Sequence, residues 1–169
     1  MLQTFLSRLG WFVLLFFLQV LIFNHINIMG YAMPMPYVYF LLLLSSETPR
    51  WVYIALGFVL GLAVDLFTDT PGMAAASLCA CGLVAPLLLA KFAPSDKDTD
   101  ELRPSAVTMK WTGFLGYAFC LTLLHCILYF TIEAFSLRDW QTLLINIGAS
   151  TVLTFFLIIA FELLRVRKQ

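Results

Sequence analysis

Charge is what this 169-residue sequence has least of. Only 12% of its residues are Asp, Glu, Lys or Arg, whereas 62% are hydrophobic. Soluble domains carry about 25% charged and at most about 50% apolar residues. The composition therefore excludes an ordinary soluble domain and indicates an integral membrane protein.

The sequence also lacks the common enzyme signatures. It contains no Walker loop, GxGxxG, HExxH or GxSxG pattern, and it has only two histidines. A membrane ATPase would need the phosphate-cradling loop. We therefore expect a protein that is not an enzyme. Because membrane enzymes can carry their acids and bases on separate helices, an enzyme acting on a lipid stays open as an alternative.

The sequence has four cysteines, and their positions argue against a metal site. Cys79, Cys81, Cys120 and Cys126 all fall inside apolar runs, where a thiol acts as a small apolar side chain. Cys79 and Cys81 would point about 200° apart on a helix, which is a poor metal pair. We expect no metal, no disulfide and no cofactor.

Long apolar runs are what the sequence has instead. About twenty helical residues cross a hydrocarbon core of about 30 Å, and a backbone surrounded by lipid must be helical to satisfy its own polar groups. The sequence therefore predicts an all-α integral membrane protein, a single transmembrane domain over residues 1–169 with six spans. The expected spans are 9–28, 31–46, 51–68, 72–92, 111–132 and 142–164.

The second span is the least regular of the six. It begins with MPMP, and its fully apolar part, residues 37–44, is too short to cross alone. The prediction requires residues 31–36 to lie in the membrane as a kinked or irregular approach packed against protein. The first run is expected to stay as a span, because NHINIMGY follows it in place of a small-x-small cleavage site.

The basic residues predict the orientation, because short cytoplasmic loops collect Lys and Arg. With six spans and both termini in the cytoplasm, only Arg138 lies outside. The cytoplasmic basic residues are then Arg8, Arg50, Lys91, Lys97, Arg103, Lys110, Arg165, Arg167 and Lys168. The linker 93–110 is cytoplasmic, carries both charge signs and is too short to bury a core. It is expected to be solvated, with a docking site for a cytoplasmic partner as the alternative.

One carboxylate stands out in GFVLGLAVDLFTDTPGMAAAS, residues 57–77. Asp65 lies fifteen residues after Arg50, or roughly 22 Å along a helix, which places it in the outer half of the membrane. Gly57, Gly61 and Asp65 are four residues apart and share a slanting stripe. The GxxxG part allows a second helix to approach closely.

The partner of this stripe is expected to be the next span, across a tight outer turn. Thr70 can cap that span, and Pro71 can occupy its first helical position, followed by Gly72 and a run of small residues. Folding the hairpin about residue 70 predicts which residues face each other. Asp65 would lie near Ala75 and Ala76, Gly61 near Cys79 and Ala80, and Gly57 near Gly82.

Two roles for Asp65 remain open at this point. It can be a structural acceptor that locks the hairpin by binding free N–H groups and hydroxyls such as those of Thr68, Thr70 or Ser77. It can instead belong to an outward-facing cavity, as a proton relay or ligand site. The residues of that candidate outer polar layer are Asn24, Asp65, His125 and Asn146. The second acid, Asp69, has no assigned role.

At this hairpin the sequence resembles the MreD family of bacterial rod shape-determining proteins. The family pattern, G-x-x-x-G-x-x-x-D followed by a small-residue turn, matches Gly57, Gly61, Asp65, Pro71 and Gly72. The stretch MPMPYVYFLLLLSSETPRW also resembles the family's second-span region. Beyond about residue 91 only the hydropathy is compatible.

The resemblance implies a function and a fold. It implies a non-catalytic scaffold of the cell-elongation complex in the bacterial inner membrane, which binds MreC and helps to position peptidoglycan synthases. MreB and the elongation polymerase and transpeptidase would be direct or indirect partners, and nucleic acid would not be one. The fold would be similar to the substrate-capture subunits of energy-coupling factor transporters. The alternative is a small-molecule binding or transport subunit with an outward-facing cavity.

Overall fold

The computed structural model describes residues 2–26, 32–68, 70–94, 104–134 and 139–167. These residues form helices, and no strand occurs among them. Each of the five long helices has the length and apolar composition needed to cross a membrane. They are α1 (Leu2–Leu21), α3 (Arg50–Thr68), α4 (Met73–Phe92), α5 (Lys110–Ala134) and α6 (Trp140–Val166).

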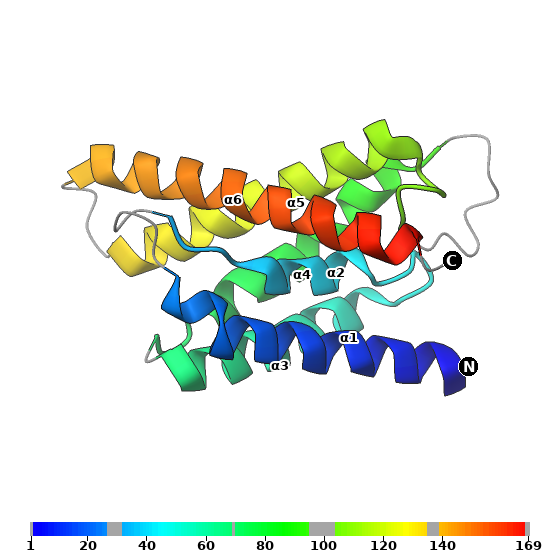
Figure 1. The fold of residues 1–169 in the computed structure, drawn as a ribbon, viewed down its shortest axis with the longest axis horizontal. Helices are drawn as coiled ribbons and strands as arrows, with labels where there is room; N and C mark the ends of the chain where they lie inside the picture. Colours follow the sequence, from blue (N-terminus) through cyan, green and yellow to red (C-terminus); the bar gives the residue numbers. More distant parts are fainter. Residues whose placement is uncertain (1, 27–31, 69, 95–103, 135–138, 168–169) are drawn as a thin grey trace.

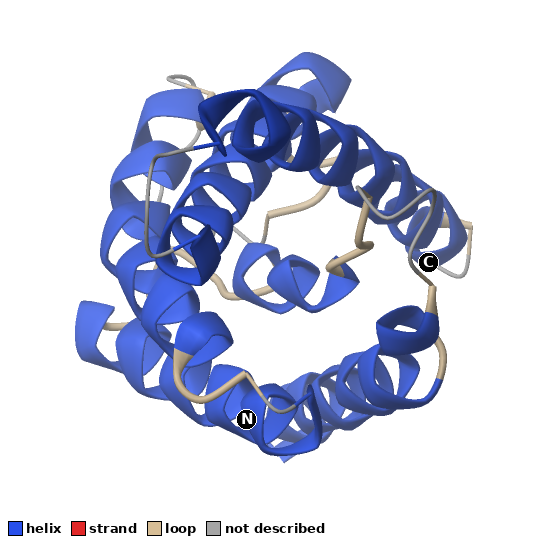
Figure 2. Ribbon diagram, turned by 90° about the vertical axis from the view of Figure 1, so that its left-hand side faces the viewer, coloured by secondary structure: helices blue, strands red, loops and turns tan. Residues whose placement is uncertain are grey.

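The long helices surround a segment of the same chain. Neighbouring contacts run from α1 to α3, α3 to α4, α4 to α5 and α5 to α6. Figure 2 shows these helices as a ring, with a short helical piece inside it. The start of α1 and the end of α6 lie at the same end of the bundle (Figure 1). The chain therefore passes along the bundle an even number of times between these two points.

The enclosed piece is the expected second span, which is built differently from the other five. We call residues 32–45 the central segment. It is non-helical up to Met35, then forms the 3₁₀ helix η2 (Pro36–Val38) and the four-residue helix α2 (Tyr39–Leu42). A second 3₁₀ helix, η1 (Phe23–His25), extends α1. Five of the six expected spans are therefore long helices, and the irregular, proline-containing approach expected for the second is confirmed for the described part of residues 31–36.

The irregular backbone also explains how so short a segment travels so far. It runs along the bundle between α1 and α6 (Figure 1). An extended residue rises more than twice as far as a helical one, so the central segment covers roughly 25–30 Å. Residues 35–44 are all buried. Their burial inside protein is the condition under which non-helical backbone is tolerated at membrane depth.

The other spans agree closely with the sequence. The bounds of α3, α4, α5 and α6 lie within two residues of those expected. The helix α1 begins at Leu2 and not at residue 9, because the helix continues through the polar residues that precede the apolar run. Apolar runs locate the membrane-crossing part of a helix and carry no signal for its extension into water.

The end of the linker is packed, not solvated. Residues 95–103, which hold most of its charges, lie outside the described residues, but 104–109 fold against the bundle. Ser105, Ala106 and Met109 are buried, at 3%, 3% and 2% exposure. The expectation of a solvated linker is therefore wrong for this part, because specific partners on α6 hold it in place.

Large apolar side chains cover the outside of the ring. On α1 they include Leu9, Val13, Phe17 and Leu21, and on α6 Leu144, Val152, Phe156 and Leu163. Soluble monomeric proteins rarely expose so many large apolar side chains, and such a surface is suited to contact with hydrocarbon. Only 11% of the α1 span is buried, against 44% for α4 and for α5. The helix α1 is therefore the most peripheral of the five.

Candidate functional site

Asp65 binds the beginning of α4 with both carboxylate oxygens. It is 4% exposed, near the end of α3. Its Oδ1 accepts hydrogen bonds from the N–H of Ala74 (3.0 Å) and the hydroxyl of Thr70 (3.0 Å), and its Oδ2 accepts one from the N–H of Ala75 (2.9 Å). This is the geometry of a structural acceptor.

The cause lies at the start of α4, which has no cap of its own. The N-cap residue is Gly72, at φ +85°, a left-handed conformation that glycine adopts without strain. Glycine has no side chain to accept the free N–H groups of the first turn. Asp65 therefore caps α4 from the neighbouring helix, where the positive end of the helix dipole also favours an anion.

Several details of the expected turn are wrong. α4 begins at Met73, so Pro71 lies in the turn and not at the first helical position. The Thr70 side chain bonds to Asp65 in place of a backbone N–H, and the Ser77 hydroxyl donates to the carbonyl of Met73 (2.8 Å). The second acid, Asp69, lies outside the described residues.

The two glycines of the stripe do face α4, but one helical turn away from the expected register. A Cβ on Gly61 would lie 2.5 Å from the Cα of Ala75, and one on Gly57 would lie 2.9 Å from the carbonyl oxygen of Leu78. Gly82 faces Tyr53. The expected pairing with Cys79, Ala80 and Gly82 assumed a symmetric turn. The helix α3 instead runs past the start of α4, because the chain folds back to bring the first N–H groups of α4 to Asp65.

The same kind of polar support holds the central segment in place. The N–H of Met33 donates to Ser150 Oγ (3.0 Å) and the N–H of Met35 donates to Thr154 Oγ1 (2.9 Å). Ser150 and Thr154 are four residues apart on α6 and therefore point the same way. They replace hydrogen bonds that an unwound backbone cannot make to itself.

The helices α1 and α3 bind the central segment as well. From α1, Gln19 Nε2 donates to the carbonyl of Pro34 (3.2 Å) and Arg8 donates to Ser45 Oγ (3.0 Å). From α3, the Tyr53 hydroxyl reaches the carbonyls of Leu44 (3.0 Å) and Ser45 (3.1 Å). Polar side chains of α1, α3 and α6 thus bind this segment at several points along its length.

His125 on α5 is one of these supports. Its Nε2 lies 2.9 Å from the hydroxyl of Tyr37, and the two rings meet edge to face at 5.2 Å. His125 is fully buried, and its Nδ1 has no protein partner. The histidine therefore binds a hydroxyl of the central segment and not the carboxylate of Asp65.

The candidate outer polar layer is not brought together as one site. Asn24 accepts a hydrogen bond from Gln19 (2.8 Å), while Asp65 and His125 have the partners given above. Asn146 borders a pocket of about 390 Å³ between the ends of α5 and α6. Its side chain shares that pocket with Glu133 and Asp139. Among the described contacts, no hydrogen bond joins any two members of this layer.

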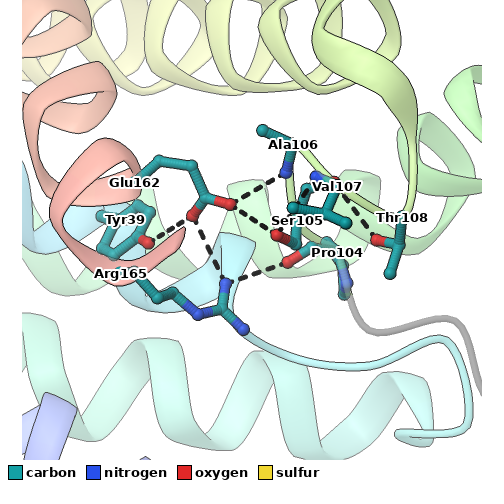
Figure 3. A network of polar contacts seen from close by, with 8 residues as sticks. All are labelled: Tyr39, Pro104, Ser105, Ala106, Val107, Thr108, Glu162 and Arg165. Atoms are coloured by element: carbon teal, nitrogen blue, oxygen red, sulfur yellow. Dashed lines mark hydrogen bonds and ion pairs between the residues drawn. The ribbon is translucent and has the colours of Figure 1, made fainter. Parts of the chain in front are cut away.

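A second buried carboxylate, Glu162 on α6, was missed in the sequence. It is completely buried, and Figure 3 shows how it is surrounded. Its Oε2 accepts from the hydroxyl of Tyr39 (2.6 Å) and lies 3.4 Å from the guanidinium of Arg165. Its Oε1 accepts from the Ser105 hydroxyl and from the N–H of Ala106, both at 2.8 Å. The signal that could have found it is the one that found Asp65, an acid inside an expected span.

The carboxylates of Asp65 and Glu162 act as hydrogen-bond acceptors, and each of their oxygens already has donors from the protein. Both buried carboxylates are bound by backbone N–H groups and hydroxyls, and all four cysteines are free thiols. In the described part of the chain, no three His, Cys, Asp or Glu side chains gather as they would around a metal ion. No protein-family model matches the chain, and no curated protein or solved structure matches it either.

Proposed function

We propose that the protein is a non-catalytic membrane scaffold of the bacterial cell-elongation complex, which binds MreC and helps to position the peptidoglycan synthases. The observation that carries this proposal is the use of the two buried carboxylates. Asp65 accepts hydrogen bonds from three donors and Glu162 from four. All seven donors are backbone N–H groups, hydroxyls or a guanidinium of the protein itself. Such an interior favours a fixed shape over a reacting centre.

The hairpin supports the resemblance to the MreD family in a physical way. Gly57 and Gly61 lie where any side chain would meet the backbone of α4. Asp65 caps α4 across the turn that holds Pro71 and Gly72. Gly57, Gly61 and Asp65 thus belong to the contact between α3 and α4, and Pro71 and Gly72 lie in the exposed turn that joins them, so a G-x-x-x-G-x-x-x-D spacing has a reason in the fold.

The charges support a bacterial inner-membrane orientation with both termini in the cytoplasm. The basic residues of the described chain lie near the helix ends on the side where α1 begins and α6 ends. They are Arg8, Arg50, Lys91, Lys110, Arg165 and Arg167. The opposite end carries the acids Asp65, Glu133 and Asp139. The positive-inside rule assigns the basic end to the cytoplasm.

The proposed MreC contact would use apolar surface that the bundle does not bury. α1 offers the most, since only 11% of its span is buried. A partner with a single transmembrane helix would compete with lipid for that face. MreB, the polymerase and the transpeptidase would then join directly or through MreC.

The test is depletion combined with co-purification. In a rod-shaped organism with no second copy, depletion should make cells wider and rounder, and MreC should co-purify with the tagged wild-type protein. The Gly61→Leu variant should lose MreC in proportion to its loss of folded protein. Unchanged cell width after depletion would contradict the proposal.

The alternative proposal is a small-molecule binding or transport subunit, similar in fold to the substrate-capture subunits of energy-coupling factor transporters. The observation that favours it is the pocket of about 390 Å³ at the outer end, where Asn146 Oδ1 is buried without a protein partner. Native mass spectrometry of gently purified protein should then show a bound small molecule. A spectrum with bulk phospholipid alone would count against this alternative.

A further inference from the structure

The loop before α5, residues 104–109, is held by two side chains of α6, Glu162 and Arg165. Glu162 Oε1 accepts both the Ser105 hydroxyl and the Ala106 N–H, and Arg165 on the next turn of α6 donates to the carbonyl of Pro104 (3.1 Å). Figure 3 shows the three contacts converging from the loop onto α6. The loop is therefore attached at three successive residues.

Internal hydrogen bonds make this loop a compact turn. The Ser105 carbonyl accepts from the N–H of Met109 (3.0 Å) and from the hydroxyl of Thr108 (3.1 Å). Ala106 and Met109 are buried, whereas Val107 between them is 64% exposed. One face of the turn thus packs on the bundle while the other faces outward.

A strained residue joins this turn to α5. Lys110 has φ +60°, and it is the one described residue other than glycine with a positive φ. The left-handed conformation is unfavourable for a residue with a Cβ and persists only where its surroundings impose it. The contacts of residues 104–106 with Glu162 and Arg165 hold the turn that leads into Lys110. Release of these contacts would allow Lys110 to take a more favourable backbone conformation.

The same carboxylate also binds the central segment. Tyr39 of α2 donates to Glu162 Oε2 at 2.6 Å, on the oxygen opposite the one that holds the loop. Withdrawal of residues 104–106 removes two donors from a carboxylate that is completely buried. An under-satisfied buried carboxylate is costly, so it would attract water or turn toward Arg165. Either response disturbs the bond to Tyr39.

We propose that residues 104–109 form a latch, closed on Glu162, which couples the position of the cytoplasmic linker to the central segment of the bundle. The linker residues 95–103 precede the latch directly in the sequence. A partner that binds the linker would therefore act first on Pro104 to Ala106. The strained Lys110 biases the latch toward opening, and Glu162 holds it shut. The latch does not depend on the elongation-complex proposal, because it requires only the contacts around Glu162.

Hydrogen exchange measured by mass spectrometry on the full-length protein in nanodiscs tests the closed state. In Glu162→Gln, the amides of residues 105–109 should exchange about tenfold faster or more, as expected when bonds to a charged acceptor are weakened. Glu47→Gln, which changes an exposed acid at the same end, should leave exchange unchanged. Wild-type exchange rates across 104–109 in a folded Glu162→Gln protein would overturn the latch.

Exchange in the central segment measures whether the latch is coupled to it. In Glu162→Gln, the amides of residues 39–44 should also exchange faster, and Tyr39→Phe should speed exchange at 104–109. Faster exchange at 104–109 with no change at 39–44 would mean a simple loop anchor and would overturn the coupling.

Two milder variants keep the test decisive if Glu162→Gln does not fold. Ser105→Ala removes one donor and should speed exchange of the latch. Lys110→Gly removes the left-handed strain and should slow it, by about threefold after allowing for the added freedom of glycine. Opposite signs for these two variants support the latch, and equal signs would contradict it.

Discussion

The hydroxyl of Thr154 on α6 accepts a hydrogen bond from the backbone N–H of Met35, 119 residues earlier in the chain, at 2.9 Å. Both groups are buried, Thr154 completely and Met35 at 2% exposure. The bond, with its neighbour from Met33 to Ser150, allows a polypeptide to cross the bundle without being a helix. The polar residues of the spanning helices thus take over part of the backbone hydrogen bonding.

Thr154→Val should destabilise the protein by about 1–3 kcal/mol, because it keeps the shape of the side chain but leaves the Met35 N–H without an acceptor in a dry interior. Thermal unfolding in detergent measures this change. The matched control is Thr142→Val on the same helix, where the threonine is exposed, and its effect should stay within about 0.5 kcal/mol. Equal midpoints for the two variants would contradict the assigned role of Thr154.

Asp65→Asn should lower the yield of folded protein and cost about 1–3 kcal/mol, since the amide NH₂ cannot accept a hydrogen bond from α4. Fluorescence-detected size-exclusion chromatography and thermal unfolding report the two effects. Asp139→Asn provides the control, because Asp139 is exposed and makes no capping bond to α6. A variant that is fully abundant and bound to its partners, yet inactive, would favour a chemical role for Asp65.

Gly61→Ala should destabilise the bundle by about 1–3 kcal/mol, because its Cβ would lie 2.5 Å from the backbone of Ala75 and force the two helices apart. Gly148→Ala is the matched control. A Cβ on Gly148 meets nothing within 4 Å, so alanine there should be neutral or stabilise α6 by up to about 1 kcal/mol. Similar losses at both positions would show that the α3–α4 contact is not the cause.

Cysteine labelling should place Ser7 and Glu47 on the same side of the membrane, with Gln141 on the other. All three are exposed. Ser7 lies near the start of α1, and Glu47 lies between the central segment and α3, so both are at the basic end of the bundle. A membrane-impermeant maleimide applied to intact cells should therefore label Gln141→Cys alone. The protein without an added cysteine corrects for the four native thiols. Labelling of Ser7→Cys and Glu47→Cys from opposite sides would exclude a crossing by residues 32–45.

Composition and apolar run length determined most of the architecture. The helices α3 to α6 follow from runs of about twenty apolar residues, because lipid leaves the backbone no partner outside its own helix. The prolines before Tyr37 indicated an irregular second crossing, and the small residues after Gly72 indicated a close contact between α3 and α4. The structural alternative for Asp65 also followed from the sequence, since an acid inside an expected span needs hydrogen-bond partners from the protein.

Tertiary structure alone decided which polar groups meet. Ser150 and Thr154 satisfy backbone groups more than a hundred positions away, and no local pattern encodes such a pairing. The register of Gly61 against Ala75 depends on how far α3 runs past the turn, which the position of Asp65 sets. Glu162 gains its importance only when α2 and residues 105–106 meet at its carboxylate. The physical reason is common to all three: burial makes every hydrogen-bond partner obligatory, but the sequence does not say which group will be within reach.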